Sequence, residues 1–155
     1  MLPPVLVLIA CALDAETQAA QDYVLRIQPV LIENGFLAER LLVLSARVYN
    51  RQADDHAIRR TWTDEIAPLA EHLHDQASFV TPPGPWAPAH TGLVDIWGDR
   101  AQAYRALGRA IDHGDPTRWQ EARELTDSVK LREEEWFATT NQRLATYGLE
   151  VDPFP

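Results

Sequence analysis

The chain is poor in the residues that build cross-links and metal–sulfur sites. Cys11 is its only cysteine and Met1 its only methionine. A single thiol excludes an internal disulfide framework and any zinc or iron–sulfur centre held by several thiolates. Cations are scarce too, with 14 Lys and Arg against 23 Asp and Glu, and the sequence does not cluster them. The formal charge of −9 would repel a phosphate backbone, so we expect no nucleic-acid partner.

Long apolar runs are also missing. The most apolar stretch, residues 1–11, is far shorter than the roughly 20 residues that a membrane-spanning helix needs. With 155 residues, 46% of them hydrophobic and 24% charged, the chain has the composition of a globular protein with a single core. No long low-complexity segment interrupts it, which excludes disorder for most of its length.

The residues that end at the single cysteine form a short motif. Leu8-Ile9-Ala10-Cys11 resembles the lipobox of bacterial lipoproteins, in which an apolar residue and two small or apolar residues precede a cysteine. The resemblance covers residues 1–11 and implies a partial signal segment that is cut before Cys11. It also implies that Cys11 carries a diacylglycerol and an acylated amino group, and several acyl chains hold a protein on a membrane where one would not. Residues 12–155 would then form a domain anchored to a bacterial membrane on its extracytoplasmic side, periplasmic or at the cell surface.

A second interpretation of the same segment stays open. Lipoprotein signals open with basic residues, and neither Lys nor Arg precedes Cys11. In this interpretation the apolar segment packs on the folded domain and Cys11 is a small buried hydrophobic residue. The protein would then be cytoplasmic.

A proline-rich segment divides the rest of the chain into two halves. Residues 81–88 contain four prolines, which forbid both a helix interior and a strand ladder. Before this segment, the apolar pattern predicts a helix over residues 14–50 that stays continuous, although kinked, through Pro29 and Gly35. A second helix is predicted over residues 54–79, with a further kink at its proline.

Two more helices are predicted after the proline-rich segment. Pro88 suits a first helical turn, and Gly114 supplies the left-handed residue that commonly ends a helix. Asp115 as N-cap and Pro116 at the first helical position then open the last helix. Gly148 closes it in the same way as Gly114 closes the helix before.

Apolar residues recur every three or four positions in all four predicted helices. The most regular stripe is that of the first helix: Tyr23, Ile27, Val30, Asn34, Leu37, Leu41, Leu44 and Val48. Its one polar member, Asn34, is expected to fix helix register. The stripe of the last helix includes Trp119, Leu125 and Trp136. No segment alternates with the period of two typical of a strand.

These patterns predict an all-α protein, a single up-down-up-down four-helix bundle with a kinked first helix. In that topology the N-terminus, the proline-rich segment and the C-terminal tail share one end of the bundle. Trp86 at this end is expected either to enter a membrane interface or to cap the core.

Helix phase and position along the bundle together single out four charged residues. Arg26, Glu65, Arg100 and Glu133 each fall near the apolar face of their helix, at a similar distance from the shared end. They are expected to form a polar core layer. The layer would serve either as a polar pocket or as ion pairs that fix helix register, and such buried pairs add little net stability.

Aromatic residues offer a second candidate ligand pocket. The residues expected to face inward are His90, Trp62, Trp97 and Trp136. Inward tryptophans either line a pocket for an apolar ligand or fill the core. His90 is expected to be a core histidine that hydrogen-bonds to the proline-rich segment or the tail.

Metal and catalytic sites are not expected. The pair Glu71 and His74 has the Glu-x-x-His spacing found in di-iron bundles, but no second such motif exists, and the helix phase points both side chains toward solvent. The sequence has no Gly-rich phosphate loop and no Gly-x-Ser-x-Gly motif. We expect no cofactor and regard an enzyme as the least supported class.

Two functions therefore remain. The first is a lipid-anchored extracytoplasmic lipoprotein that binds or scaffolds an unknown protein or small molecule. The second is a soluble four-helix bundle that binds a ligand or a metal through the polar core layer or His90.

Overall fold

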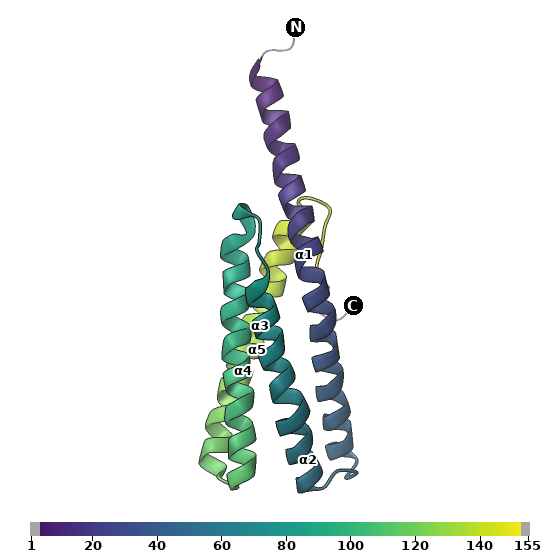
Figure 1. Ribbon diagram of the computed structural model, residues 1–155, viewed down its shortest axis with the longest axis vertical. Helices are drawn as coiled ribbons and strands as arrows, with labels where there is room; N and C mark the ends of the chain where they lie inside the picture. The colour runs from purple at the N-terminus through teal and green to yellow at the C-terminus, as the bar shows by residue number, and fades with distance from the viewer. Residues whose placement is uncertain (1–3, 153–155) are drawn as a thin grey trace.

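The computed structural model describes the backbone of residues 4–152 and the side chains of residues 15–152. Every element within these residues is helical, which confirms the all-α class (Figure 1). The order is α1 Pro4–Tyr49, α2 Asp55–Thr61, a π-helical turn η1 Trp62–Ile66, α3 Ala67–Phe79, a 3-10 turn η2 Gly84–Trp86, α4 Ala87–His113 and α5 Pro116–Ala145. Because α2, η1 and α3 follow one another without a break, the chain forms four long helical units.

Helix α1 is longer than predicted. It begins at Pro4, so Asp14 lies inside the helix and is not its N-cap. The reason is that no helix breaker separates Pro4 from Asp14, and proline is well suited to a first helical turn. Pro29 lies within the helix, which continues through Gly35 as predicted.

The predicted irregularity at Pro68 takes the form of a π-turn. Proline has no N–H to donate to the carbonyl of Asp64, four residues earlier, and its ring would clash with that carbonyl. The turn before it is widened, so the N–H of Ala67 bonds to the carbonyl of Trp62, five residues back. The helix then continues as α3 without ending.

The helix ends follow the predicted chemistry. Asp54 caps α2 by accepting a hydrogen bond from the N–H of Ala57 at 2.7 Å, and Asp115 caps α5 through the N–H groups of the first turn. Gly114 and Gly148 both have positive φ, as the left-handed residue after a helix requires. Arg51 takes the same conformation after α1, although no residue pattern there predicted it.

The packing between helices is uneven. α4 packs against α3 on one side and α5 on the other, whereas α1 packs against α2, η1, α3 and η2. Within the described residues, α1 has no extended contact with α5. Three residues of the predicted stripes are therefore partly uncovered instead of buried, because no helix lies over them: Val48 at 46% exposure, and Trp119 and Leu125 at 41% each.

Aromatic contacts close the end of the bundle where the proline-rich segment lies. Trp86 is buried and stacks on Tyr23 of α1, with ring centroids 5.1 Å apart. Arg143 of α5 covers the Trp86 ring at 4.1 Å, and Tyr147 meets its edge. Trp86 is thus a cap on the core, and its side chain is not free to enter a membrane interface. In the C-terminal tail, the backbone of Val151 forms two hydrogen bonds with the side chain of Asn141 in α5.

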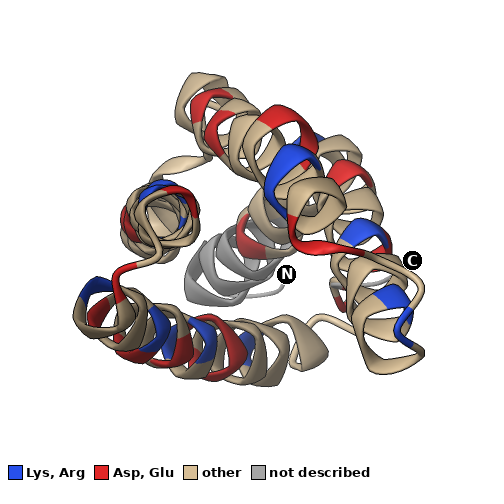
Figure 2. Ribbon diagram, turned by 90° about the horizontal axis from the view of Figure 1, so that it is seen from below, with Lys and Arg blue, Asp and Glu red and all other residues tan. Residues whose placement is uncertain are grey.

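Charge is mixed over the outer surfaces of the helices. Figure 2 shows basic and acidic residues following one another on the same helices. Several form exposed pairs, such as Arg40 with Glu65 and Arg105 with Glu71. Of the described helices, none combines the length and the apolar character that crossing a bilayer requires.

Candidate functional site

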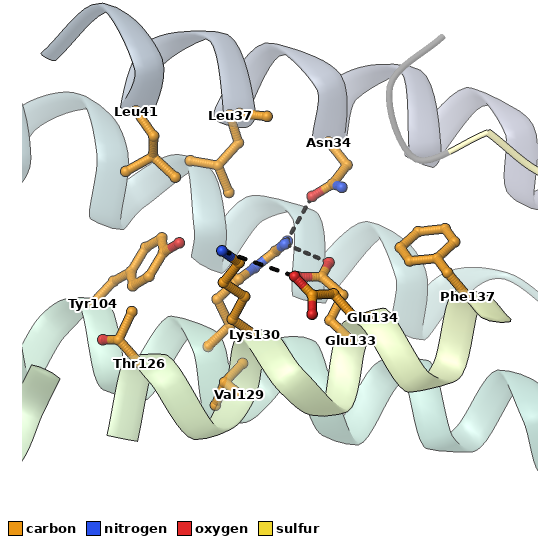
Figure 3. A pocket seen from close by; sticks show the side chains of 12 residues that line it. Asn34, Leu37, Leu41, Tyr104, Thr126, Val129, Lys130, Glu133, Glu134 and Phe137 are labelled. Carbon is orange, nitrogen blue, oxygen red and sulfur yellow. Dashed lines mark hydrogen bonds and ion pairs between the residues drawn. The ribbon is translucent and has the colours of Figure 1, made fainter. Parts of the chain in front are cut away.

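A groove lies where α1 and α5 fail to meet, with α4 as its floor. Its cavity measures about 390 Å³, within the range of small-molecule sites. Its walls are largely apolar, and Figure 3 shows that the side chains of α1 and α5 point into the space from opposite sides. The lining residues are Asn34, Leu37, Ala38 and Leu41 of α1, Arg100 and Tyr104 of α4, and Thr126, Val129, Lys130, Glu133, Glu134 and Phe137 of α5.

Helical spacing explains why these residues share the groove. On α1, Asn34, Leu37 and Leu41 are separated by three and four positions, so they lie on one face. On α5, Val129 and Glu133 are four positions apart and share one face, from which Glu133 bonds to Arg100 of α4. The apolar members of the two rows would pack against each other if α1 and α5 were closer together.

A buried polar cluster occupies one side of the groove. Arg100 is only 5% exposed, and its Nη1 donates 2.8 Å hydrogen bonds to Oδ1 of Asn34 and to Oε1 of Glu133. Trp97 donates to the same Glu133 oxygen at 2.8 Å, and its ring lies 4.7 Å from the Arg100 guanidinium carbon. Two helices besides α4 therefore fix the position of this cation.

The Arg100 guanidinium nevertheless keeps two unused donors. Its Nε and Nη2 are buried and have no hydrogen-bond partner in the structure. These two nitrogens form one edge of the planar group, the fork that matches two acceptor oxygens. A buried charged group with unpaired N–H bonds is costly. Both nitrogens are also closed off from solvent.

Tyr104 adds a phenol to the groove wall next to Arg100. Burial raises the pKa of Tyr104, the positive charge of Arg100 opposes the rise, and Glu133 adds to it. The phenol is therefore neutral at ordinary pH and is able to donate or accept a hydrogen bond.

The rim of the groove is solvated. Lys130 and Glu134 lie on the outer edge of α5 and form an exposed pair at 3.8 Å, visible in Figure 3. Exposed pairs of this kind contribute little to stability. They do place charges of both signs at the entrance.

The predicted polar layer of four is only half correct. Arg100 and Glu133 do pair inside the bundle, at 2.8 Å. Arg26 is exposed and instead donates to the carbonyl of Thr81 in the proline-rich segment, because it lies at the edge of the apolar face and its long side chain reaches outward.

Glu65 is also absent from the layer. It is exposed and pairs with Arg40 on the surface at 2.9 Å. Glu65 belongs to the π-turn, where more residues fill each turn than in an α-helix. A phase count of 100° per residue therefore places its side chain on the wrong face.

The predicted aromatic pocket is not the cavity found. Trp97 and Trp136 are core residues whose indole N–H groups bond to Glu133 and to the Ala89 carbonyl, and neither lines the groove. Trp62 borders a separate cavity of about 210 Å³ beside η1, and its N–H bonds to the Tyr104 carbonyl. His90 is buried, as expected of a core histidine, but its Nε2 lies 2.9 Å from the carbonyl of Ala77 in α3 and not from the proline-rich segment or the tail.

The remaining candidates lie on the surface or outside the described side chains. Glu71 forms an ion pair with Arg105, and His74 lies beside Asp75. Among the side chains of residues 15–152, no group of three or more His, Cys, Asp or Glu is placed to hold a metal ion. Cys11 falls outside the side chains that the structure describes.

Sequence reasoning missed the groove itself. The stripe of α1 contained Asn34, Leu37 and Leu41, but the pattern shows only that a face is apolar and not whether another helix covers it. Asn34 was the available signal, since a polar residue within an apolar stripe requires a partner, and here that partner is Arg100.

Comparisons with protein-family models, with curated proteins and with solved structures found no match to this chain. The chemistry of the groove is what bears on function. Largely apolar walls enclose the groove, the buried pair of Arg100 and Glu133 lies at one side, and the entrance is solvated.

Proposed function

We propose that the protein is a binding protein whose site is the groove between α1 and α5, and that it takes up an apolar small molecule there. The observation that carries the proposal is the cavity of about 390 Å³ between α1 and α5, whose walls are largely apolar. A core held together only by packing would be expected to close such a space, because interiors are close to crystal density. An occupant would restore contacts to the apolar walls.

Filling the groove tests this proposal. Ala38 lines the groove from α1, whereas Ala138 is exposed on α5 and does not line it. Binding of Nile red, a neutral apolar dye, is measured by fluorescence titration in the unaltered protein, in Ala38→Trp and in Ala138→Trp. We expect saturable binding that Ala38→Trp weakens at least tenfold and Ala138→Trp leaves within twofold. Equal affinity in all three proteins, with helicity confirmed by circular dichroism, would contradict the proposal.

We further propose that the bundle has up-down-up-down topology and is held at the extracytoplasmic face of a bacterial membrane by an acylated Cys11. Two observations support this. The lipobox-like residues end at Cys11, and Glu16, in the N-terminal half of α1, accepts a 3.4 Å hydrogen bond from the hydroxyl of Tyr147, just after the end of α5. The anchor and the closed end of the bundle would then lie on the same side, with the groove further along the helices.

Metabolic labelling tests the anchor. A bacterial host that expresses the full chain is fed a fatty acid with a clickable tag, and the protein is compared with Cys11→Ser. We expect label in the first and none in the second. Equal labelling of both, or absence of label from both in a host that labels its own lipoproteins, would contradict the anchor and would leave the groove proposal untouched.

A further inference from the structure

Tyr104 presents an unpaired hydroxyl to the groove. The residue is only 7% exposed and lines the cavity from α4, and Figure 3 shows its hydroxyl pointing into the space between α1 and α5. Its ring is held by an edge contact with Trp62, with ring centroids 5.2 Å apart. The backbone carbonyl of Tyr104 accepts a hydrogen bond from Trp62, but within residues 15–152 the hydroxyl has no partner.

This hydroxyl is open to the cavity. The side-chain atoms of the described residues that are both unpaired and closed off from solvent are Tyr23 Oη, His90 Nδ1, and Nε and Nη2 of Arg100. The Tyr104 hydroxyl is unpaired but is not one of them, so part of its surface is accessible from the cavity that it lines. A ligand that displaces solvent from the groove has to supply an oxygen to this donor, because a polar group left without a partner lowers affinity.

The charges beside Tyr104 favour an uncharged ligand. Arg100 and Glu133 form an ion pair at 2.8 Å, and both lie close enough to Tyr104 to act on the pKa of its hydroxyl, in opposite directions. Since the two charges compensate each other, a carboxylate or an ammonium group in the groove would lose its hydration without gaining an unpaired counter-charge. A neutral acceptor oxygen avoids this cost and matches the protonated phenol.

The other walls of the groove suit an apolar body. Leu37 and Leu41 of α1 point into the space from one side, and Val129 and Phe137 of α5 from the other. Apolar groups lying between the two helices would be removed from water, and each buried methylene contributes favourably to binding.

We infer that the ligand of the groove is an uncharged apolar carbonyl compound, whose oxygen accepts a hydrogen bond from the hydroxyl of Tyr104. This inference rests on the proposal that the groove is a binding site. It adds the chemical class of the ligand and the residue that orients it.

Four probes that share the phenylpentane skeleton separate the polar group from the apolar body. Valerophenone carries a carbonyl, pentylbenzene has a methylene in its place, and 5-phenylpentanoate and 5-phenylpentylammonium carry charges. Their affinities for the full chain are measured by displacement of Nile red. We expect each charged probe to bind about tenfold or more weakly than valerophenone, because its charge is desolvated without compensation.

Tyr104→Phe then assigns the carbonyl contact. It keeps the ring and removes only the hydroxyl, so the ratio of valerophenone affinity to pentylbenzene affinity should fall by about fivefold or more. The matched control Tyr147→Phe, whose hydroxyl bonds to Glu16 away from the groove, should keep the original ratio. Because the Tyr104 hydroxyl has no partner in the described structure, Tyr104→Phe should also keep the melting temperature, which circular dichroism checks.

Infrared spectroscopy of the bound ketone gives a second readout that needs no variant. The carbonyl stretching band is isolated by comparing valerophenone with its carbonyl-¹³C form. A hydrogen bond weakens the C=O bond, so the band should lie at lower wavenumber in the unaltered protein than in hexane. In Tyr104→Phe it should return toward the hexane position.

The outcomes distinguish this inference from the proposal on which it rests. If Nile red binds but the affinity ratio survives Tyr104→Phe, or the bound carbonyl band coincides with that in hexane, the assignment to Tyr104 is wrong and the groove remains a binding site. If either charged probe binds more tightly than valerophenone, the uncharged class is wrong. If neither Nile red nor any probe binds, the inference and the proposal are both wrong.

Discussion

Arg100 holds a full positive charge inside the bundle, and Glu133 is its only anionic partner in the described structure. Removing one member of a buried ion pair costs much more than the pair contributes as a whole, because the other charge is left without compensation. The pair is thus a point at which a single substitution has a large effect on the free energy of unfolding.

Glu133→Ala tests this residue directly. We expect the free energy of unfolding to fall by about 3 kcal/mol, since Arg100 keeps only the neutral oxygen of Asn34 as partner. Urea unfolding followed by circular dichroism measures the change. The neighbouring exposed Glu134→Ala serves as control and should stay within about 0.5 kcal/mol. An equal unfolding midpoint for Glu133→Ala and the unaltered protein would mean that the carboxylate is solvated.

His90 makes stability depend on pH. Burial lowers the pKa of His90 below its ordinary value of 6.5, although hydrogen bonding to the backbone carbonyls of Ala77 and Val80 acts in the opposite direction. Below pH 6.5 the unfolded chain therefore binds more protons at this residue than the folded chain does. The contribution of His90 is fully present above pH 6.5 and is lost as the pH falls toward its lowered folded-state pKa.

Unfolding curves between pH 7.5 and pH 5.5 check this sign. The unaltered protein should lose stability on acidification by up to about 1.4 kcal/mol per pH unit from this one group. His90→Gln should show a shallower dependence, whatever its stability at pH 7.5. Gln52→Ala, at an exposed residue that does not titrate, serves as control and should keep the original slope. A slope that stays the same in His90→Gln would show that His90 takes up a proton as readily when folded as when unfolded.

At the level of the helices, substitutions at two glycines distinguish the effect of backbone strain from the effect of steric crowding. A methyl group at Gly114 or at Gly84 would meet no atom within 4 Å, but only Gly114 has a positive φ, of 62°. Left-handed backbone is unfavourable for residues with a side chain. The difference between the two sites is therefore purely conformational.

Alanine substitutions at Gly114 and Gly84 are expected to have different effects on the free energy of unfolding. We expect Gly114→Ala to lower the free energy of unfolding by about 1 kcal/mol or more, because alanine must adopt the strained conformation that ends α4. Gly84→Ala should leave stability unchanged or slightly raise it by restricting the unfolded chain. Thermal unfolding of both variants provides the comparison. A similar loss at Gly84 would point to an effect other than φ.

The ends of the helices were predictable because they depend on local chemistry. Asp54, Asp115, Gly114 and Gly148 each act within a few residues along the chain, so the pattern of side chains is enough to locate them. The π-turn before Pro68 was harder to predict, since a proline inside a helix permits several local adjustments of the backbone and the surrounding packing selects one of them. Glu65 was misplaced for that reason.

The position of the candidate site could not be predicted from the pattern of residues along the chain. Pairing of Arg100 with Glu133 followed from helix phase, but the groove exists because α1 and α5 stay apart, which is a property of how whole helices pack. Trp62, Trp97 and Trp136 looked equally suited to a pocket and to the core. Their indole N–H partners, which decide the matter, lie more than thirty residues away along the chain.

For the whole molecule, the uneven packing makes α1 the element that separates most easily. α4 is covered by α3 and α5, whereas the half of α1 near Leu41 borders the groove and ends in exposed residues such as Val48 and Tyr49. Segments with few buried apolar contacts open with a smaller free energy than the global unfolding transition.

Hydrogen exchange measured by mass spectrometry tests this hierarchy. Backbone amides of residues 37–49 should exchange faster than those of residues 93–108, and an occupant in the groove should slow the first set more than the second. Nile red at saturating concentration supplies the occupant. If both segments exchange at the same rate without ligand, the bundle opens only as a single unit.

The π-turn at residues 62–66 also bears on which length changes the chain tolerates. The π-turn takes up one residue more than a turn of α-helix, so deleting one residue there would allow regular winding and leave α2 and α3 facing α4 as before. Regular winding would, however, bring the Pro68 ring against the carbonyl four residues earlier. Insertions or deletions at the 50–54 connection, where the chain is exposed and leaves the helical path, would meet no such obstacle. Natural variants of this protein that lack one residue in the first stretch should therefore also lack Pro68, whereas the length of the second stretch should vary freely.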